Sequence, residues 1–231
     1  MNLSTHTTDT ARCLAMLGLL VAAPPLLPQT IVPVEQEPVH TIVFENDVVR
    51  VIDAALPVGH ATLYHTHVRD NVPVVVAGGR VAITLIGREA VGSVVKIGEV
   101  SFAVGGYTHV VRNVGPTPLR FIDVELRTSA PAAPVSPPAT ASPLAGHALE
   151  LSNARVHVHR VIVSPGRRLD AHQHPGPVLA VVVAGDAVQR GASAASPVAA
   201  GSFRWHGDAA MGAVRHRGRV PYEVVEVEWI K

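Results

Sequence analysis

Two histidines separated by a single residue are the first feature of this sequence that could carry chemistry. His65 and His67 flank Thr66, and on a β-strand their side chains would point to the same face. Two neighbouring imidazoles can chelate a cation, but such a pair is more often a surface feature than a ligand pair. His157 and His159 form a second pair with no other candidate ligand near them in the sequence. We interpret this second pair as structural.

The residues around His65 and His67 follow a spacing that resembles the cupin superfamily. Its first motif has Gly, His, His, Glu and Gly, and the matching positions are Gly59, His65, His67, Asn71 and Gly78. Its second motif has Gly, Pro, Gly, His and Asn, and the matching positions are Gly98, Val104, Gly106, His109 and Asn113. The chain departs from these motifs at Asn71 and Val104. Because histidine fills only 13 of 231 positions, three histidines at prescribed places seldom arise by chance.

This resemblance implies a small jelly-roll barrel with a metal inside its mouth. His65 and His67 would come from one strand and His109 from a strand that faces it. Neutral imidazoles suit Zn, Cu, Fe and Ni, and three of them leave positions open for water or substrate. We expect one divalent transition metal (Fe, Zn, Ni, Cu or Mn) on these three histidines. Asn71 in place of glutamate removes an anionic ligand. Tyr107 is interpreted as a packing residue, with a place in the pocket wall or a role as hydrogen-bond donor as the alternative.

The chain also contains an internal repeat. Residues 107 positions apart (65 and 172, for example) match as Asn46 with Asn153, Gly59 with Gly166, His65 with His172, His67 with His174 and Gly78 with Gly185. Farther along, Gly98, Asn113 and Glu125 match Gly201, His216 and Glu228 at an offset of 103 (98 and 201, for example). Constant offsets over most of each half predict two copies of one fold.

The second copy keeps fewer of the motif residues. Gly212 stands where the counterpart of His109 would lie, and we consider His206 as a substitute ligand for that missing histidine. We therefore predict that His172 and His174 lack a third imidazole. The C-terminal barrel would then be a degenerate partner that packs sheet against sheet with the first, and the chain would bind one metal.

Valine runs, few aromatic residues, 19 glycines and 19 prolines favour short strands joined by tight turns. In the first copy we expect eight strands, the first at 48–54 and the last at 120–126, with another at 100–104. Gly78-Gly79 is typical of a hairpin with positive φ. The predicted fold class is all-β, with two tandem cupin jelly-roll barrels.

Composition divides the chain into four parts. Residues 1–30 form a signal peptide or disordered tail, because Arg12 precedes an apolar run at 13–23 that is too short to span a bilayer. The N-terminal cupin domain covers 35–128 and the degenerate C-terminal one covers 144–231. The segment between them, 129–143, has five prolines with Ala, Ser and Thr and predicts a semi-rigid linker. We expect export to the periplasm or medium, with a cytoplasmic location as the alternative.

The predicted partner is a small-molecule substrate or ligand. The near balance of 19 Lys and Arg against 18 Asp and Glu, without a basic stripe, argues against nucleic acid. No stable membrane span is expected, and a homodimer could form through barrel edges.

An open three-histidine site implies a metal-dependent enzyme, dioxygenase-like or of another cupin class, that acts on a small organic substrate. The alternative is a non-catalytic module that captures a small ligand or a metal. The acidic residues that we find near the motif histidines are Asp70 and Glu99, and neither is an evident general base. The sequence therefore assigns no catalytic residue and leaves open whether the protein is an enzyme.

Overall fold

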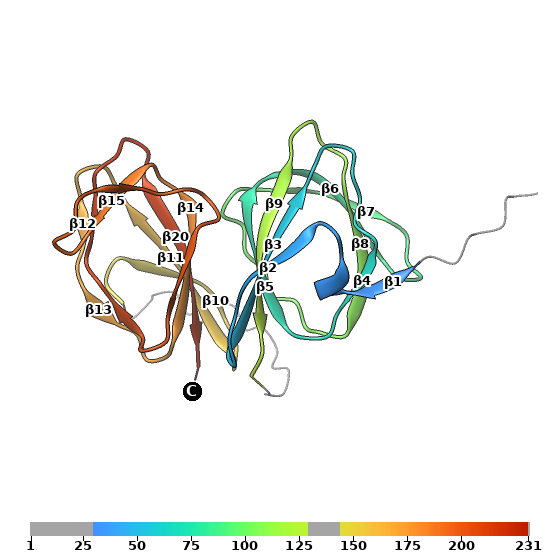
Figure 1. Ribbon diagram of the computed structural model, residues 1–231, viewed down its shortest axis with the longest axis horizontal. Coiled ribbons are helices and arrows are strands. Elements are labelled where there is room, and N and C mark those ends of the chain that lie inside the picture. Colours follow the sequence, from blue (N-terminus) through green and yellow to red (C-terminus); the bar gives the residue numbers. More distant parts are fainter. Residues whose placement is uncertain (1–29, 129–143, 231) are drawn as a thin grey trace, which may run out of the picture.

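The computed structural model describes residues 30–128 and 144–230, which form two β-barrels that lie side by side (Figure 1). The described residues contain no α-helix, and the prediction of an all-β fold with two jelly-roll barrels is confirmed. The predicted leader, apart from its last residue, and the predicted linker lie outside the described residues.

The first barrel consists of two sheets. Its elements are β1 (Ile31–Pro33), a 3-10 turn η1 (Val34–Gln36), β2 (His40–Glu45), β3 (Val49–Leu56), β4 (Tyr64–His67), β5 (Asn71–Ala77), β6 (Gly79–Leu85), β7 (Val91–Val95), β8 (Tyr107–Asn113) and β9 (Leu119–Leu126). One sheet has the order β2-β3-β9-β5 and the other β1-β4-β8-β6-β7. Only the β1–β4 pairing is parallel among the strand pairs of this barrel.

The second barrel repeats this plan, with shorter strands in its outer sheets. Its elements are β10 (His147–Ser152), β11 (Val156–Val163), β12 (Arg168–Leu169), β13 (His172–Gln173), β14 (Val178–Ala184), β15 (Ala187–Arg190), β16 (Ser196–Pro197), β17 (Phe203–His206), β18 (Ala210–Met211), β19 (Val214–His216) and β20 (Tyr222–Trp229). The order β10-β11-β20-β14-β17 forms the sheet next to the first barrel, and β12-β19-β15-β16 and β13-β18 form the outer sheets.

Two local predictions about the strands are wrong. The segment 100–104 forms only isolated bridges, at Val100 and Ala103. Gly78 and Gly79 do not close a hairpin, because β5 pairs with β9 whereas β6 pairs with β7 and β8. Neither glycine has a positive φ. A Cβ on Gly78 would lie 2.5 Å from the carbonyl oxygen of Val95, so this glycine allows close backbone approach where the chain crosses between sheets.

A shared apolar core joins the two barrels. Strands β9 and β20 run through the middle of the facing sheets and contribute Ile122, Val124, Leu126, Val225, Val227 and Trp229 to it. The alternate residues of these strands are buried acids that point into the barrels: Asp123, Glu125, Glu226 and Glu228. In a sheet that faces solvent, the outward residues are polar and the inward ones apolar, whereas along these two strands the apolar residues face outward. The outward face is apolar because it meets the other barrel, and the inward face carries these four acids.

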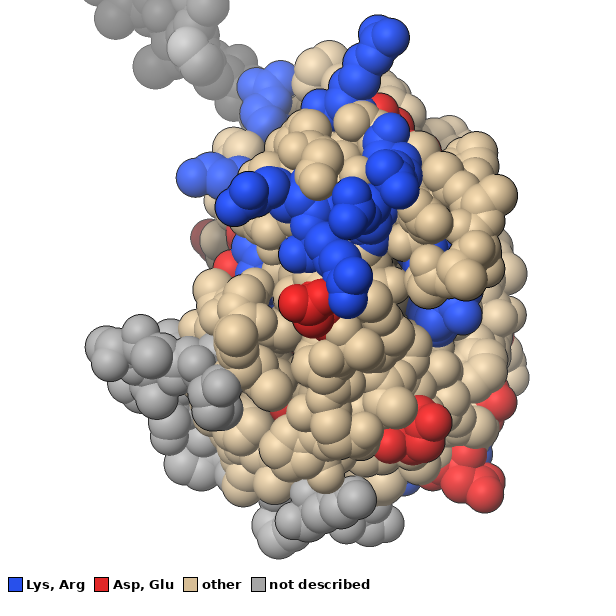
Figure 2. Space-filling view, turned by 90° about the vertical axis from the view of Figure 1, so that its left-hand side faces the viewer, with Lys and Arg blue, Asp and Glu red and all other residues tan. Residues whose placement is uncertain are grey.

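Several arginines of the second barrel gather on its outer face (Figure 2). Arg168 on β12 lies opposite Arg215 on β19, and Arg167 and Arg217 are exposed beside them. Within the described residues, no helix has the length and apolar character needed to cross a membrane.

Candidate metal centres

Strand pairing brings the three predicted histidines of the first barrel together. Strands β4 and β8 are antiparallel neighbours, with His65 opposite His109 and His67 opposite Tyr107. One ring nitrogen from each histidine lies within 4.8 Å of the others, and the Nε2 atoms of His65 and His109 are 2.9 Å apart. The geometry is that of a ligand cluster, and metal binding by it stays a prediction.

Burial favours the neutral form of His65 and of His109. Removal from water lowers the pKa of His65 to about 4 and that of His109 to about 2, with neighbouring histidines adding to both effects. Nδ1 of His65 lies 3.0 Å from the carbonyl oxygen of Leu63 and must donate its hydrogen there. The lone pair of His65 is therefore on Nε2, the nitrogen that faces His109.

Asn71, the residue in place of the motif glutamate, acts on His67 from its other side. Its amide group lies 2.9 Å from Nδ1 of His67 and 3.0 Å from the hydroxyl of Tyr107. The Tyr107 ring stacks on His67, with ring centroids 4.9 Å apart. The atom placed there is the amide nitrogen, which only donates, so it leaves the hydrogen of a neutral His67 on Nε2. Metal binding through Nε2 therefore requires the amide to be turned so that its oxygen accepts from Nδ1–H, which is how ligating histidines are commonly oriented. Asn71 thus positions a histidine, and Tyr107 lines the pocket, which was the alternative to a packing role.

The sequence reasoning missed His40, which approaches the cluster from β2. Its ring centroid lies 4.7 Å from that of His65 and 6.2 Å from that of His67. Burial, together with the two neighbouring imidazoles, lowers its pKa to about 3. A signal was present, because His40 and His147 have the same offset of 107 as the other repeated residues (40 and 147).

A cavity of about 270 Å³ opens beside these histidines. Its walls are mainly apolar and include Leu56, Val75, Val81, Ile83, Val111 and Phe121, with His40, His65, His67 and His109 at one side. Asp123 also lines it, and complete burial raises the pKa of this carboxyl group to about 6. Of the two acids that the sequence singled out, Asp70 lies outside this cavity and is bound to Arg155 and to the backbone of Gly105. Glu99 is an exposed residue of the cavity lining.

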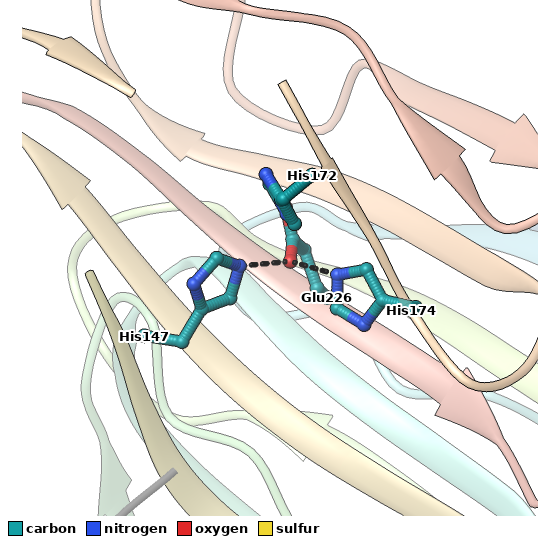
Figure 3. Close-up of side chains that lie close together, drawn as sticks. All are labelled: His147, His172, His174 and Glu226. Carbon is teal, nitrogen blue, oxygen red and sulfur yellow. Dashed lines mark hydrogen bonds and ion pairs between the residues drawn. The ribbon is translucent and has the colours of Figure 1, made fainter. Parts of the chain in front are cut away.

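In the second barrel, the prediction that His172 and His174 lack a third imidazole is wrong. His147 on β10 supplies it, and Glu226 on β20 adds a carboxylate, with one ligand atom from each of the four residues within 4.8 Å of the others. Figure 3 shows these side chains converging from β10, β13 and β20. Met211 lies opposite His172 in the strand register, which is the place that His109 has in the first barrel. His206 lines the neighbouring cavity with His172 but is outside the cluster.

Opposite charges stabilise this second cluster. Burial alone would lower the pKa of His174, but its contacts with Glu226 and Glu228 raise it to about 9. Burial would likewise raise the pKa of Glu226, but His147 and His174 lower it to about 2. His159, interpreted from sequence as structural with no ligand near it, is also in a cluster, with its Nε2 3.2 Å from Oε2 of Glu228. That interpretation failed because the strand pairing β11–β20 brings distant residues beside it.

Comparison with known proteins places this architecture among the cupins. No family model and no curated protein sequence matches the chain. The structure of AerE from Microcystis aeruginosa matches with a TM-score of 0.60 and 11% identity, covering 84% of this chain and 99% of that one. Oxalate decarboxylase from Lactobacillus farciminis, as a formate complex, matches with a TM-score of 0.57 and 13% identity over 82% and 80% of the two chains.

A variant of salicylate 1,2-dioxygenase from Pseudoaminobacter salicylatoxidans gives a TM-score of 0.54 and 13% identity over 79% and 70% of the two chains. The chain is thus a double jelly-roll protein with a histidine cluster inside each barrel. Its fold is that of the two-domain cupins, and the resemblance inferred from the motifs is confirmed. At these identities the likeness shows the fold alone.

Proposed function

We propose that the chain is a metal-dependent enzyme whose N-terminal barrel binds a divalent transition metal through His65, His67 and His109. The substrate would be a small organic molecule held in the adjacent cavity. The observation that carries the proposal is the convergence of three buried imidazoles at the wall of an apolar cavity of about 270 Å³. A cation with three protein ligands keeps open positions, and here they would face the cavity.

The donor set fits such a metal. Three imidazoles suit borderline transition-metal ions. Any such ion could polarise a carbonyl group, and a redox-active one such as iron could also bind dioxygen. The protein side chains would do the rest of the work. The apolar walls bind the hydrocarbon part of the substrate and exclude water, and Tyr107 and Asn71 hold the ring of His67 in place.

Asp123 is the best candidate for a proton-transferring residue. It lines the same cavity, and its buried carboxyl group has a pKa near the range in which an enzyme works. We propose that it accepts a proton from the bound substrate or returns one to the product. Asp123→Asn would then lower turnover while metal content stays unchanged.

Metal analysis and turnover test this proposal together. His109→Ala should lower the metal content of purified full-length protein by one equivalent, because two ligands on one strand cannot close a stable site. His60→Ala, which changes an exposed histidine near the same strand, is the matched control and should retain the full content. Dioxygen uptake with candidate phenols and thiols then measures catalysis. An unchanged metal content in His109→Ala refutes the site, and saturable ligand binding without turnover supports the non-catalytic alternative.

A further inference from the structure

In the second barrel, His147 has acceptor oxygens at both of its ring nitrogens. Nδ1 lies 3.0 Å from the carbonyl oxygen of Ala145, and Nε2 lies 2.9 Å from Oε2 of Glu226. A neutral imidazole carries a single N–H, so it can donate to only one of these oxygens. The other nitrogen would direct its lone pair at an oxygen lone pair. The position between His147 and Glu226 therefore requires a positive charge.

His174 presents the same problem from the other side of Glu226. Nδ1 lies 3.0 Å from Oε2 of Glu228, and Nε2 lies 3.2 Å from Oε2 of Glu226. The second of these contacts does not have hydrogen-bond geometry, so Nε2 of His174 is buried and has no hydrogen-bond partner in the part of the chain that the structure describes. Both imidazoles thus converge on one oxygen of Glu226, as the two dashed lines in Figure 3 show.

His172 supplies the third nitrogen. Its Nδ1 lies 3.0 Å from the carbonyl oxygen of Asp170 and donates to it, which leaves the lone pair on Nε2. Nε2 is buried and has no hydrogen-bond partner among the described residues. Protonation of His147 and His174 would supply positive charge but would leave this lone pair unsatisfied. Buried polar atoms are rarely left in that state without a reason.

We propose that the C-terminal barrel binds a second divalent transition metal ion through Nε2 of His147, His172 and His174 and Oε2 of Glu226. One cation satisfies all three nitrogens and replaces the protons that the oxygen of Glu226 would otherwise require. Each histidine already has its Nδ1 beside an oxygen atom: those of Ala145, Asp170 and Glu228. An oxygen acceptor on the second ring nitrogen is the usual arrangement of metal-bound histidines.

The internal repeat supports this assignment independently. The four residues correspond to His40, His65, His67 and Asp123 of the first barrel, at offsets of 107 for the histidines and 103 for the acid (123 and 226). The two clusters share the paired histidines but differ in the residues that complete them, since His147 belongs to the second cluster and its counterpart His40 is not among the three residues of the first. His109 completes the first, whereas the longer side chain of Glu226 reaches the imidazoles of the second. Each barrel therefore has a complete cluster of its own.

A cavity of about 520 Å³ adjoins the second cluster and is lined by His172 and Glu226. Arg190 and Arg204 also line it. A metal ion bound here could therefore be reached from solvent, and any open coordination position would face a basic cavity. This access allows the ion to be loaded and removed without unfolding the barrel.

Cobalt(II) titration of the full-length chain tests the second site. Wild-type protein should bind two equivalents by equilibrium dialysis, and His65→Ala/His109→Ala, which removes the first site, should bind one. In that background, Glu226→Gln and His147→Gln should each weaken the remaining binding by at least about a hundredfold, since removing a ligand costs more than removing its hydrogen-bond partner. The visible absorption of bound cobalt should disappear with it.

His157→Gln is the matched control, because His157 lies on the neighbouring strand β11 and bonds to Ser152 outside the cluster. It should keep the full equivalent. Circular dichroism of each variant checks folding, and Glu226→Gln, which preserves side-chain shape, covers the case in which His147→Gln does not fold. The proposal is overturned if the folded double variant binds no cobalt, or if Glu226→Gln binds it as tightly as the control. Either result would leave the first site unaffected.

Discussion

Arg155 joins the two barrels through an ion pair that is almost fully buried, and its removal should destabilise the whole chain. Its guanidinium group donates to the carboxylate of Asp70 and to the backbone oxygen of Thr128, both in the first half of the chain. The side chains of Arg155 and Asp70 are only 6% and 9% exposed. Arg155→Ala would leave Asp70 with the backbone N–H of Gly105 as a hydrogen-bond donor, 2.8 Å away.

The expected cost is about 3–5 kcal/mol, the usual result of removing one partner from a buried ion pair. This is a large part of the roughly 5–15 kcal/mol by which proteins are stable. Arg168→Ala is the control, because it breaks an ion pair with Asp170 whose side chains are 53% and 79% exposed, and it should cost at most about 1 kcal/mol. Replacing both partners, as Asp70→Asn with Arg155→Met, should recover more than half of the loss.

Equilibrium unfolding in urea measures these differences. The two tryptophans report on the junction, since Trp229 belongs to the shared core and Trp205 packs against it. The fluorescence transition of Arg155→Ala should move to lower urea, together with the circular dichroism transition. If Arg155→Ala costs no more than Arg168→Ala, the ion pair does not hold the barrels together and the reasoning is wrong.

Four further outcomes are expected. Leu179→Ala, in the shared core and fully buried, should lower the free energy of unfolding by about 2–5 kcal/mol in urea titrations. Asn113→Ala should cost about 2–3 kcal/mol in the same assay, because the buried amide bonds to the backbone of Leu56, Gly115 and Thr117. Removing bound metal with a chelator should lower the melting temperature, and metal at about 100 times its Kd should restore about 2.7 kcal/mol. Intact-mass measurement on protein from the native cell should show a chain without the apolar segment 13–23.

The sequence predicted the barrels and the first cluster because both depend on local patterns. Alternation places His65 and His67 on one face, and the repeat sets the relation between the two halves. It did not predict β2 and β10, the strands that carry His40 and His147. In β2, Ile42 and Val43 are exposed and Phe44 is half-buried, and in β10 Leu151 alone is buried, so the apolar periodicity of both strands is weak. They become strands by pairing with β3 and β11.

The second cluster was missed for a related reason. The motif comparison searched for a third histidine at the position of His109, where the second barrel has Gly212 in the sequence and Met211 in the strand register. The third imidazole is instead that of His147, which precedes His172 by more than twenty residues (147 and 172). Motif spacing records which residues lie on a given pair of strands, but a barrel brings several strands to the same interior point.

The position of Glu226 depends on the packing between the barrels. Because side chains alternate along β20, Val225 and Val227 can face the shared core only if Glu226 and Glu228 face the interior of the second barrel. A shift of one residue would bring both glutamates into the apolar junction and the valines against the histidines. The apolar contact with the first barrel therefore fixes the strand register that supplies the carboxylate. On this reasoning, separating the barrels should weaken cobalt binding at the second cluster even though the four ligands remain in the chain.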